Sequence, residues 1–249
     1  LASTVQSDLA FIFGSPLSAN RIVRGTLPAG RDRYIIKGSL PDPAMFTGFH
    51  LHRALRSDGV GLGEGFTADK TNYLEPATYR VIHNHQSPML SQLVRHTNAE
   101  SDNLFAEALL LQIGAHAGDP SIEGGLRALD EFYGPVCQTQ YPFFAYDGSG
   151  LSRFTSISAR QVVQVLRMAR QNPTLNDAML SRLPLAGREG SMKWFALRTN
   201  LAGNLRAKSG SMDGVRAYAG YFTAFSGREM AFAILVNNFE ASGTEIRKN

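Results

Sequence analysis

Residues 204–237 read NLRAKSGSMDGVRAYAGYFTAFSGREMAFAILVN and change from polar turn residues to apolar and aromatic runs three times. The three runs cover residues 204–211, 215–225 and 229–237. Asp213-Gly214 and Ser226-Gly227 separate them, and Asp-Gly between two strand-like runs is a strong hairpin signal. This part of the sequence therefore predicts three consecutive antiparallel strands.

The residues before this sheet have helix signatures. Asp42-Pro43 is an N-cap followed by proline at the first helical position, and it predicts a helix that continues to Ser57 and is stopped by Gly59. Ser87-Pro88 predicts the start of another helix, with apolar positions from Leu90 onward. Further helices are predicted at residues 101–114, 121–133 and 158–170. The first of these is apolar nearly all round, which predicts a buried helix.

Residues 1–40 have a different character. Val5–Phe13 and Tyr34–Lys37 are rich in residues that favour strands, and glycine and proline punctuate the segment. Because the helical signatures begin at Pro41, we expect a domain boundary there. The sequence predicts a β-rich segment over residues 1–40 and one larger domain over residues 41–249.

Composition excludes several classes of protein. With 249 residues and 43% hydrophobic content, the chain can bury a sizeable core. It contains no run of roughly 18 apolar residues, and its start lacks the features of a signal peptide, so the sequence has the features of a mature or truncated chain. The net charge of +4 is scattered, and no nucleic-acid-binding signature accompanies it. Cys137 is the single cysteine, which excludes an internal disulfide framework.

Two short motifs carry the candidate chemistry. Ser101-Asp102-Asn103 stands at the predicted start of a helix, and Lys208-Ser209-Gly210-Ser211 lies in the first predicted strand of the sheet. Each has an ordinary structural explanation when taken alone. Ser101 and Asn103 are residue types that cap helices, and a lysine in a strand is usually a solvated charge. The two motifs gain weight because they occur together, in this order.

Longer segments extend the pattern. In serine penicillin-binding proteins and β-lactamases, the motifs S-x-x-K, S-D-N and K-T-G converge on one cleft. The segments 101–111 (SDNLFAEALLL), 147–153 (DGSGLSR), 183–187 (LPLAG) and 207–215 (AKSGSMDGV) resemble the class C low-molecular-mass penicillin-binding proteins, the D-alanyl-D-alanine carboxypeptidase/endopeptidase family. The resemblance runs from about Pro41 to Asn237. Residues 1–40 resemble the end of the β-rich insertion that this family carries.

The resemblance implies a fold and an activity. The fold would be α/β, with the serine β-lactamase and penicillin-binding architecture: an antiparallel sheet with helices on both faces. The activity would be a serine-type carboxypeptidase or endopeptidase reaction on peptidoglycan stem peptides ending in D-Ala-D-Ala, with β-lactams as covalent inhibitors. The resemblance implies no metal or organic cofactor. It places the protein in the periplasm or cell envelope, with cell-wall or peripheral membrane contact and no nucleic-acid partner.

The resemblance also assigns roles to residues. Lys208 would attract the terminal carboxylate of the substrate, and the hydroxyls of Ser209 and Ser211 would hydrogen-bond to it. Gly210 lies between them, and the backbone N–H of Ser211 would donate to the oxyanion. Ser101 would relay a proton and Asn103 would hold the substrate amide. We assign no chemical role to Asp102, and we interpret Asp147-Gly-Ser-Gly as a turn that marks kinship.

The sequence departs from the family pattern in two ways. Ser209 stands where threonine is usual, which keeps the hydroxyl and loses a methyl group, and we expect this to be tolerated. The second departure is larger, because none of the five lysines has a serine three residues before it. Thr67-Ala-Asp-Lys70 is the nearest imitation of S-x-x-K, and it lies after the insertion, where the family does not place its nucleophile. We therefore expect the nucleophile upstream of Leu1.

Two alternatives stay open on the sequence. A β-lactamase or esterase on the same fold would use the same motifs, although the 147–153 segment argues against it. A non-catalytic peptidoglycan-binding descendant would keep the anion site and lack the nucleophile.

Overall fold

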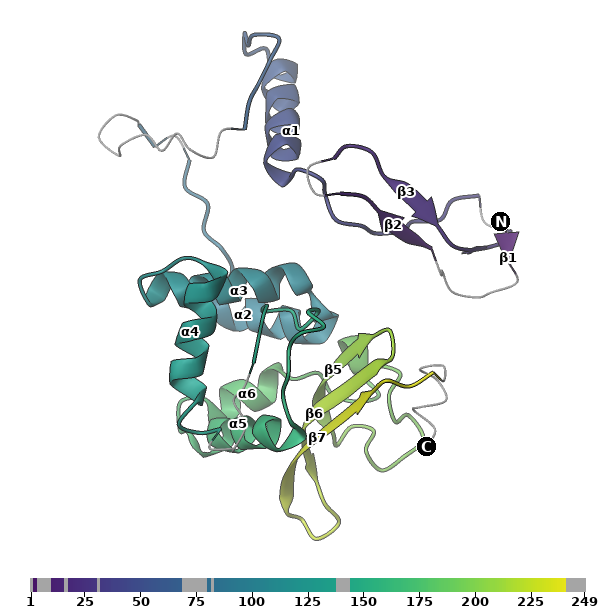
Figure 1. Ribbon diagram of the computed structural model, residues 1–249, viewed down its shortest axis with the longest axis vertical. Coiled ribbons are helices and arrows are strands. Elements are labelled where there is room, and N and C mark those ends of the chain that lie inside the picture. Colours follow the sequence, from purple (N-terminus) through teal and green to yellow (C-terminus); the bar gives the residue numbers. More distant parts are fainter. Residues whose placement is uncertain are drawn as a thin grey trace. The chain divides into compact units, whose positions relative to one another are not determined.

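The computed structural model describes residues 2–3, 10–15, 18–30, 32–68, 80–81, 83–137 and 144–240 (Figure 1). The chain divides into two compact units, Leu1–Asn84 and His85–Asn249. The division follows Asn84 and does not precede Pro41, because helix α1 (Pro43–Ser57) belongs to the first unit. The domain boundary expected at Pro41 remains a prediction.

Short strand pairs form part of the first unit. β1 (Ala2–Ser3) pairs in parallel with β4 (Leu27–Pro28), and β2 (Phe11–Phe13) pairs antiparallel with β3 (Ile22–Arg24). β2 matches the end of the strand predicted at Val5–Phe13, of which residues 5–9 lie outside the described part of the chain. The strand predicted at Tyr34–Lys37 is wrong, because these residues have no regular structure. Strand propensity alone does not decide the structure of a segment, because it depends on the packing that the fold provides.

Helix α1 begins and ends where the sequence predicts. The Asp42 side chain accepts a hydrogen bond from the Met45 N–H at 3.0 Å, and Pro43 is the first helical residue. Beyond Ser57, Gly59 has a φ of +82°, a conformation that costs glycine little and that ends the helix.

Helices make up the first part of the second unit. They are α2 (Leu90–His96), the π-helical turn η2 (Thr97–Ser101), α3 (Asn103–His116), α4 (Ile122–Tyr133), α5 (Ala159–Gln171), α6 (Asn176–Arg182) and the 3₁₀ turn η3 (Gly190–Met192). The helices predicted from residues 87, 101, 121 and 158 are therefore confirmed, with α2 starting later than Ser87-Pro88 indicates. Ser158 and Gln161 cap α5 reciprocally, as their spacing predicts.

The prediction that α3 is buried is wrong for this chain. Its buried residues are Leu110 and Gly114, whereas Leu104 is 74% exposed. α3 packs closely against α4, where an added Cβ on Gly125 would lie 2.4 Å from the Leu110 carbonyl oxygen. A helix that is apolar on all sides needs partners on all sides, and the described residues surround α3 only in part.

The predicted three-stranded sheet is confirmed. β5 (Arg206–Met212), β6 (Val215–Thr223) and β7 (Glu229–Asn237) are antiparallel neighbours in the order β5-β6-β7. Met212 pairs with Val215 across Asp213-Gly214, and Gly214 has a φ of +67°. This two-residue connection sets the register that aligns Lys208 with Ala219.

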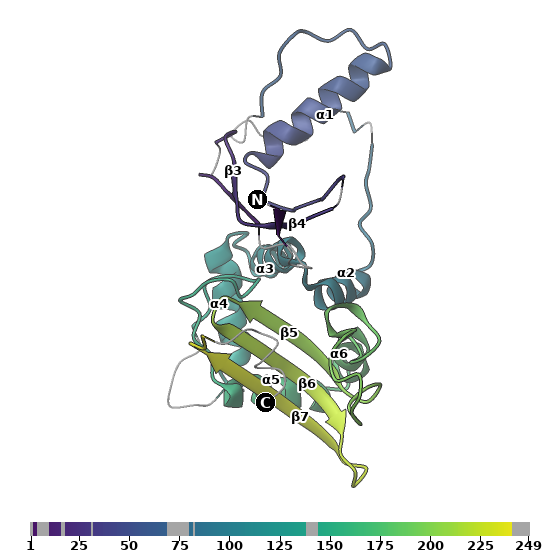
Figure 2. The same ribbon diagram turned by 90° about the vertical axis from the view of Figure 1, so that its right-hand side faces the viewer.

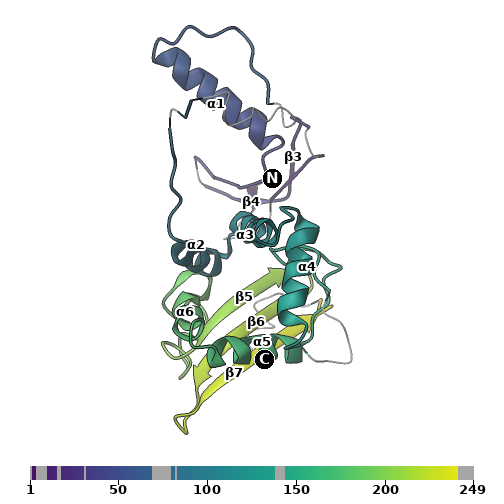
Figure 3. The same cartoon turned by 90° about the vertical axis from the view of Figure 1, so that its left-hand side faces the viewer.

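Two hydrophobic clusters lie on opposite faces of the sheet. On one face, Tyr221 packs with Leu166 of α5 and Leu183, and its hydroxyl donates to the Leu166 carbonyl oxygen at 2.7 Å. Figures 2 and 3 show from opposite sides that α5 lies against this face. On the other face, Phe222 packs against a cluster around Met192. The expected α/β fold class, an antiparallel sheet flanked by helices, is confirmed. Within the described residues, the cover of this second face is mostly the irregular segment 190–205.

Strand β7 is an edge strand within the described part of the second unit. It pairs with β6 on one side, and Ile234 is 53% exposed. An apolar cavity of about 340 Å³ lies between α5, α6 and the sheet, with Leu166, Met179 and Ala219 among its lining residues. The sheet and the helices over it are thus in place while part of their apolar surface stays uncovered.

Candidate functional site

Ser101 ends a π-helical turn. The N–H of Asp102 donates to the Thr97 carbonyl oxygen at 3.3 Å, a bond that spans five residues in place of the usual four. Ser101 itself has a φ of +58°, in the left-handed region that residues other than glycine rarely adopt. π-turns and such backbone outliers occur often at functional sites. The turn exposes the Ser101 side chain where a regular helix would continue.

Asp102 is the cap of α3. Its side chain accepts a hydrogen bond from the Phe105 N–H at 3.2 Å, and it lies 3.4 Å from the Nε2 of His96. The sequence offered Ser101 and Asn103 as the capping residues and left Asp102 without a role. Because Asp102 performs the capping, the hydroxyl of Ser101 takes part in a different contact.

That contact joins the two sequence motifs. The Lys208 ammonium on β5 donates a hydrogen bond to the Ser101 hydroxyl at 2.7 Å, across 107 positions of the chain. It also donates to the Ser209 carbonyl oxygen. Desolvation by burial lowers the pKa of Lys208. The side chain is half-buried and hydrogen-bonded, which contradicts its alternative interpretation as a freely solvated charge on a strand.

One pocket gathers the six residues singled out from the sequence. It has a volume of about 650 Å³, and its walls include Ser101, Asn103, Lys208, Ser209, Gly210 and Ser211. Asn103 is the first residue of α3 and is exposed. Ser191, which the sequence motifs did not indicate, also lines the pocket and accepts a hydrogen bond from the Ser209 hydroxyl at 3.0 Å. The sequence signal for Ser191 is its position shortly after the Leu183–Gly187 segment, which carries the family resemblance.

The backbone of β5 presents N–H groups to this pocket. On the outer side of the strand, away from β6, the Ala207 N–H donates to the Pro184 carbonyl oxygen at 3.1 Å. Alternate N–H groups of a strand point the same way. The N–H of Ser211 therefore also points to the outer side of β5. An N–H in this position can donate to a developing negative charge.

The Asp147–Gly150 turn forms another wall and is held by α3. The Glu107 carboxylate accepts hydrogen bonds from the N–H groups of Gly148 at 3.0 Å and Ser149 at 3.1 Å. Asp147 accepts from the N–H of Gly150 at 2.9 Å and of Ser152 at 2.7 Å. The interpretation of the segment as a turn is confirmed. The sequence motifs did not indicate this role for Glu107, which lies four residues beyond Asn103.

The described residues show neither a metal-binding cluster nor a membrane-spanning helix. No group of three or more histidine, cysteine, aspartate and glutamate side chains is arranged there to hold a metal ion. Within the same part of the chain, the helices are too short or too polar to cross a bilayer.

A protein family and several known proteins match most of this chain. A model of the D-Ala-D-Ala carboxypeptidase 3 (S13) family matches residues 4–249. The chain is 32% identical over 240 residues to a D-alanyl-D-alanine carboxypeptidase of Actinomadura sp. strain R39, an alignment that covers 91% of this chain and 43% of the relative. It is 30% identical over 230 residues to the penicillin-sensitive carboxypeptidase A of Dictyostelium discoideum, covering 85% of this chain and 42% of the relative.

Solved structures share the fold. Penicillin-binding protein 4 (dacB) of Haemophilus influenzae superposes with a TM-score of 0.80 at 20% sequence identity, over 96% of this chain and 52% of that one. A predatory endopeptidase of Bdellovibrio bacteriovorus superposes with a TM-score of 0.54 at 21% identity, over 84% of this chain and 54% of that one. The chain spans less than half the length of the two curated relatives described above.

Proposed function

The chain belongs to the D-Ala-D-Ala carboxypeptidase 3 (S13) family, and on this basis we propose that it forms part of a serine-type D-alanyl-D-alanine carboxypeptidase. The substrates would be peptidoglycan stem peptides ending in D-Ala-D-Ala, and β-lactams would acylate the same site. The observation that carries the proposal is the 2.7 Å contact between Lys208 and Ser101 in a pocket that both motifs line. Substrates of this kind place the protein in the cell envelope, against the cell wall.

Strand β5 binds the end of the substrate. The Lys208 ammonium attracts the terminal carboxylate, and the hydroxyls of Ser209 and Ser211 hydrogen-bond to it. Gly210 has no side chain, so the substrate backbone approaches β5 closely between them. The outward N–H of Ser211 donates to the oxyanion that forms when the scissile carbonyl is attacked. These groups lie on one edge of a paired sheet and need little rearrangement to act.

The π-turn and α3 provide the groups on the opposite wall. The Ser101 hydroxyl already accepts a hydrogen bond from Lys208 and can pass a proton to the departing D-alanine amine. Asn103 holds the substrate amide. In the first step a serine oxygen forms an ester with the penultimate D-alanine carbonyl and D-alanine leaves. In the second step water attacks the ester carbonyl, the bond between the acyl group and the serine oxygen breaks, and the shortened peptide leaves as a carboxylate while the serine hydroxyl is restored.

The attacking serine comes from outside these 249 residues in our proposal. Covalent catalysis of this class needs a serine beside a lysine base, and the sequence contains no serine three positions before a lysine. The pocket described here then supplies substrate binding, the oxyanion donor and the proton relay.

The proposal is tested on the full-length protein that contains this chain. A labelled penicillin should form a covalent adduct that survives a denaturing gel, and a peptide ending in D-Ala-D-Ala should release free D-alanine. Peptide mapping should place the label on a serine of an S-x-x-K motif outside the 249 residues. A full-length protein that neither binds penicillin covalently nor releases D-alanine would refute the proposal and favour a non-catalytic binding role.

A further inference from the structure

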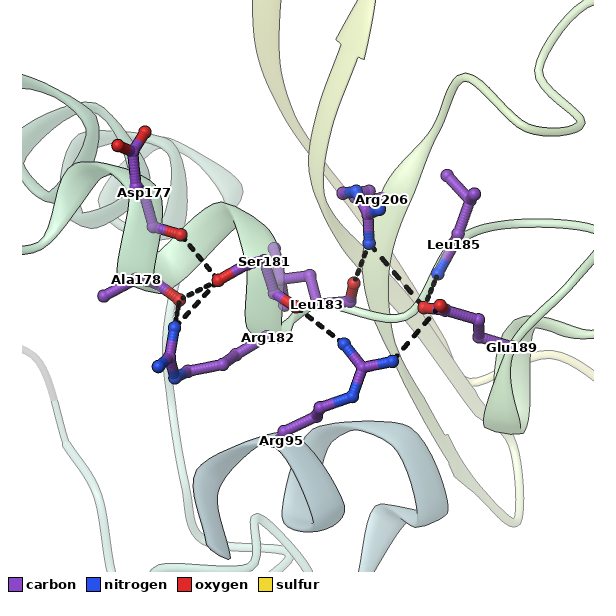
Figure 4. Close-up of polar contacts among 9 residues, drawn as sticks. All are labelled: Arg95, Asp177, Ala178, Ser181, Arg182, Leu183, Leu185, Glu189 and Arg206. Carbon is purple, nitrogen blue, oxygen red and sulfur yellow. Dashed lines mark hydrogen bonds and ion pairs between the residues drawn. The ribbon is translucent and has the colours of Figure 1, made fainter. Parts of the chain in front are cut away.

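Glu189 is the centre of a polar network beside the pocket (Figure 4). Its Oε1 accepts a hydrogen bond from the Nη2 of Arg95 at 3.2 Å, and its Oε2 accepts from the Leu185 N–H at 3.0 Å. The Nη1 of Arg206 forms an ion pair with Oε2 at 3.6 Å. Burial would raise the pKa of Glu189, but the Leu185 N–H and the two arginines outweigh it and lower the pKa. The carboxylate is therefore charged at neutral pH.

The two arginines lie on elements that continue into opposite walls of the pocket. Arg95 lies on α2, directly before the π-turn that ends at Ser101. Arg206 lies on β5, two residues before Lys208 and on the same face of the strand. Each arginine has a second, backbone anchor: Arg95 donates to Ser181 O at 2.9 Å and Arg206 donates to Leu183 O at 3.0 Å. The network thus bridges the two motif-bearing elements.

Gly190 adds a steric contact to this bridge. It has a φ of +44°, and a Cβ on it would lie 2.1 Å from the carbonyl oxygen of Ala99, inside the π-turn. The segment around it is anchored to β5. The Ala207 N–H of β5 donates to Pro184 O at 3.1 Å, and the Met192 side chain is fully buried. The 183–192 segment is therefore fixed to the sheet on one side and pressed against the π-turn on the other.

We propose that Glu189 is a positioning residue that holds Ser101 at its working distance from Lys208. Arg95, Glu189, Gly190 and Arg206, which we call the Glu189 clamp, join the π-turn to β5 through the 183–192 segment. The inference rests on the proposed function, because it assigns the clamp to the same pocket. Glu189 is not among the residues that line that pocket, so its effect on the substrate is indirect.

Loss of the clamp should affect the two walls differently. β5 is held by its full ladder with β6 and by the hydrogen bond from Ala207 to Pro184, so Lys208 and Ser211 stay in place. Apart from the Lys208–Ser101 hydrogen bond itself, the contacts described above join the π-turn to β5 through Arg95 and through Gly190. Ser101 should therefore drift while the carboxylate-binding side remains. Non-covalent binding should persist and the acylation step should slow.

The experiment measures penicillin acylation of the full-length protein by stopped-flow, separating the dissociation constant of the initial complex from the acylation rate constant. Glu189→Gln removes the charge and keeps the size of the side chain. Glu229→Gln is the matched control, because Glu229 also pairs with an arginine, Arg170 of α5, and its side chain is 34% exposed against 32% for Glu189. Glu229 does not line the pocket.

We expect Glu189→Gln to lower the acylation rate constant about 10- to 100-fold, the cost of a displacement on the order of 1 Å, with the dissociation constant nearly unchanged. Glu229→Gln should leave both constants at the wild-type values. If the wild-type protein is acylated and Glu189→Gln has the same acylation rate constant, the clamp is refuted and the proposed function is not. An equal fall in both variants would overturn it too, since a general loss of stability would then explain the result. A wild-type protein without acylation would overturn the proposed function and the clamp together.

A second variant keeps the test decisive if Glu189→Gln does not fold. Arg95→Lys retains the positive charge, but a lysine cannot reach Glu189 and the Ser181 carbonyl oxygen with two separate N–H groups of a fixed fork. It should show a smaller fall in the acylation rate constant with the same unchanged dissociation constant. An Arg95→Lys protein with the wild-type rate constant would overturn the clamp.

Discussion

Substitutions of Asp102, the cap of α3, can separate the contribution of this residue to stability from its contribution to catalysis. In Asp102→Ala, α3 loses the side chain that accepts from the Phe105 N–H, which should cost about 1 kcal/mol of unfolding free energy. The contact with His96 is exposed and adds little. For a domain of roughly 150–250 residues, that loss corresponds to a fall of about 2–4 °C in Tm.

The same substitution should disturb catalysis, because Asp102 directly follows Ser101. The left-handed conformation of Ser101 costs on the order of 1–3 kcal/mol, and the cap next to it helps to hold that conformation. Once the cap is lost, Ser101 can relax and move away from Lys208. We expect penicillin acylation of the full-length protein to fall about tenfold or more. Asp102→Asn keeps a capping oxygen and should resemble the wild type in both assays.

Ser121→Ala is the matched control. Ser121 caps α4 through a 2.9 Å hydrogen bond from the Gly124 N–H, and it does not line the pocket. It should lose a similar amount of stability and keep the wild-type acylation rate. Thermal unfolding and acylation are measured on all three variants. Equal acylation rates in Asp102→Ala and Ser121→Ala at equal loss of stability would refute the coupling between the cap and Ser101.

Three further predictions concern Lys208 and the nucleophile. In the full-length protein, Lys208→Ala should reduce the acylation rate by about 100- to 1,000-fold, whereas Ser209→Thr should be nearly neutral; a fully active Lys208→Ala variant would remove Lys208 from the mechanism. Because burial lowers the pKa of Lys208 and only its charged form attracts a carboxylate, carboxylate binding should weaken with rising pH below the ordinary lysine range. Lys208→Arg should shift this alkaline decline to higher pH, and a profile identical to the wild type would assign the decline to another group. The isolated 249-residue chain should form no stable penicilloyl ester on a denaturing gel beside the full-length protein, and a labelled short chain would direct attention to Ser101 or Ser149 as nucleophile.

The sequence by itself determined the elements whose signals are local. The Asp213-Gly214 turn and the runs around it specify the β5–β6 hairpin, because a two-residue connection fixes the register of the strands that it joins. Caps such as Asp42 act within one helical turn, so their effect is also readable from neighbouring residues. The motif residues could be recognised one by one, through the resemblance that they carry.

Only the tertiary structure decided how distant residues meet. The π-turn orients the Ser101 hydroxyl toward Lys208, and the capping by Asp102 leaves that hydroxyl available. Ser191 and Glu189 gain their places from packing of the 183–192 segment, which no periodic pattern encodes. The exposure of α3 and the absence of a strand at Tyr34–Lys37 have the same cause. Burial and strand pairing depend on which neighbours are present, whereas propensity and capping depend on residues a few positions away.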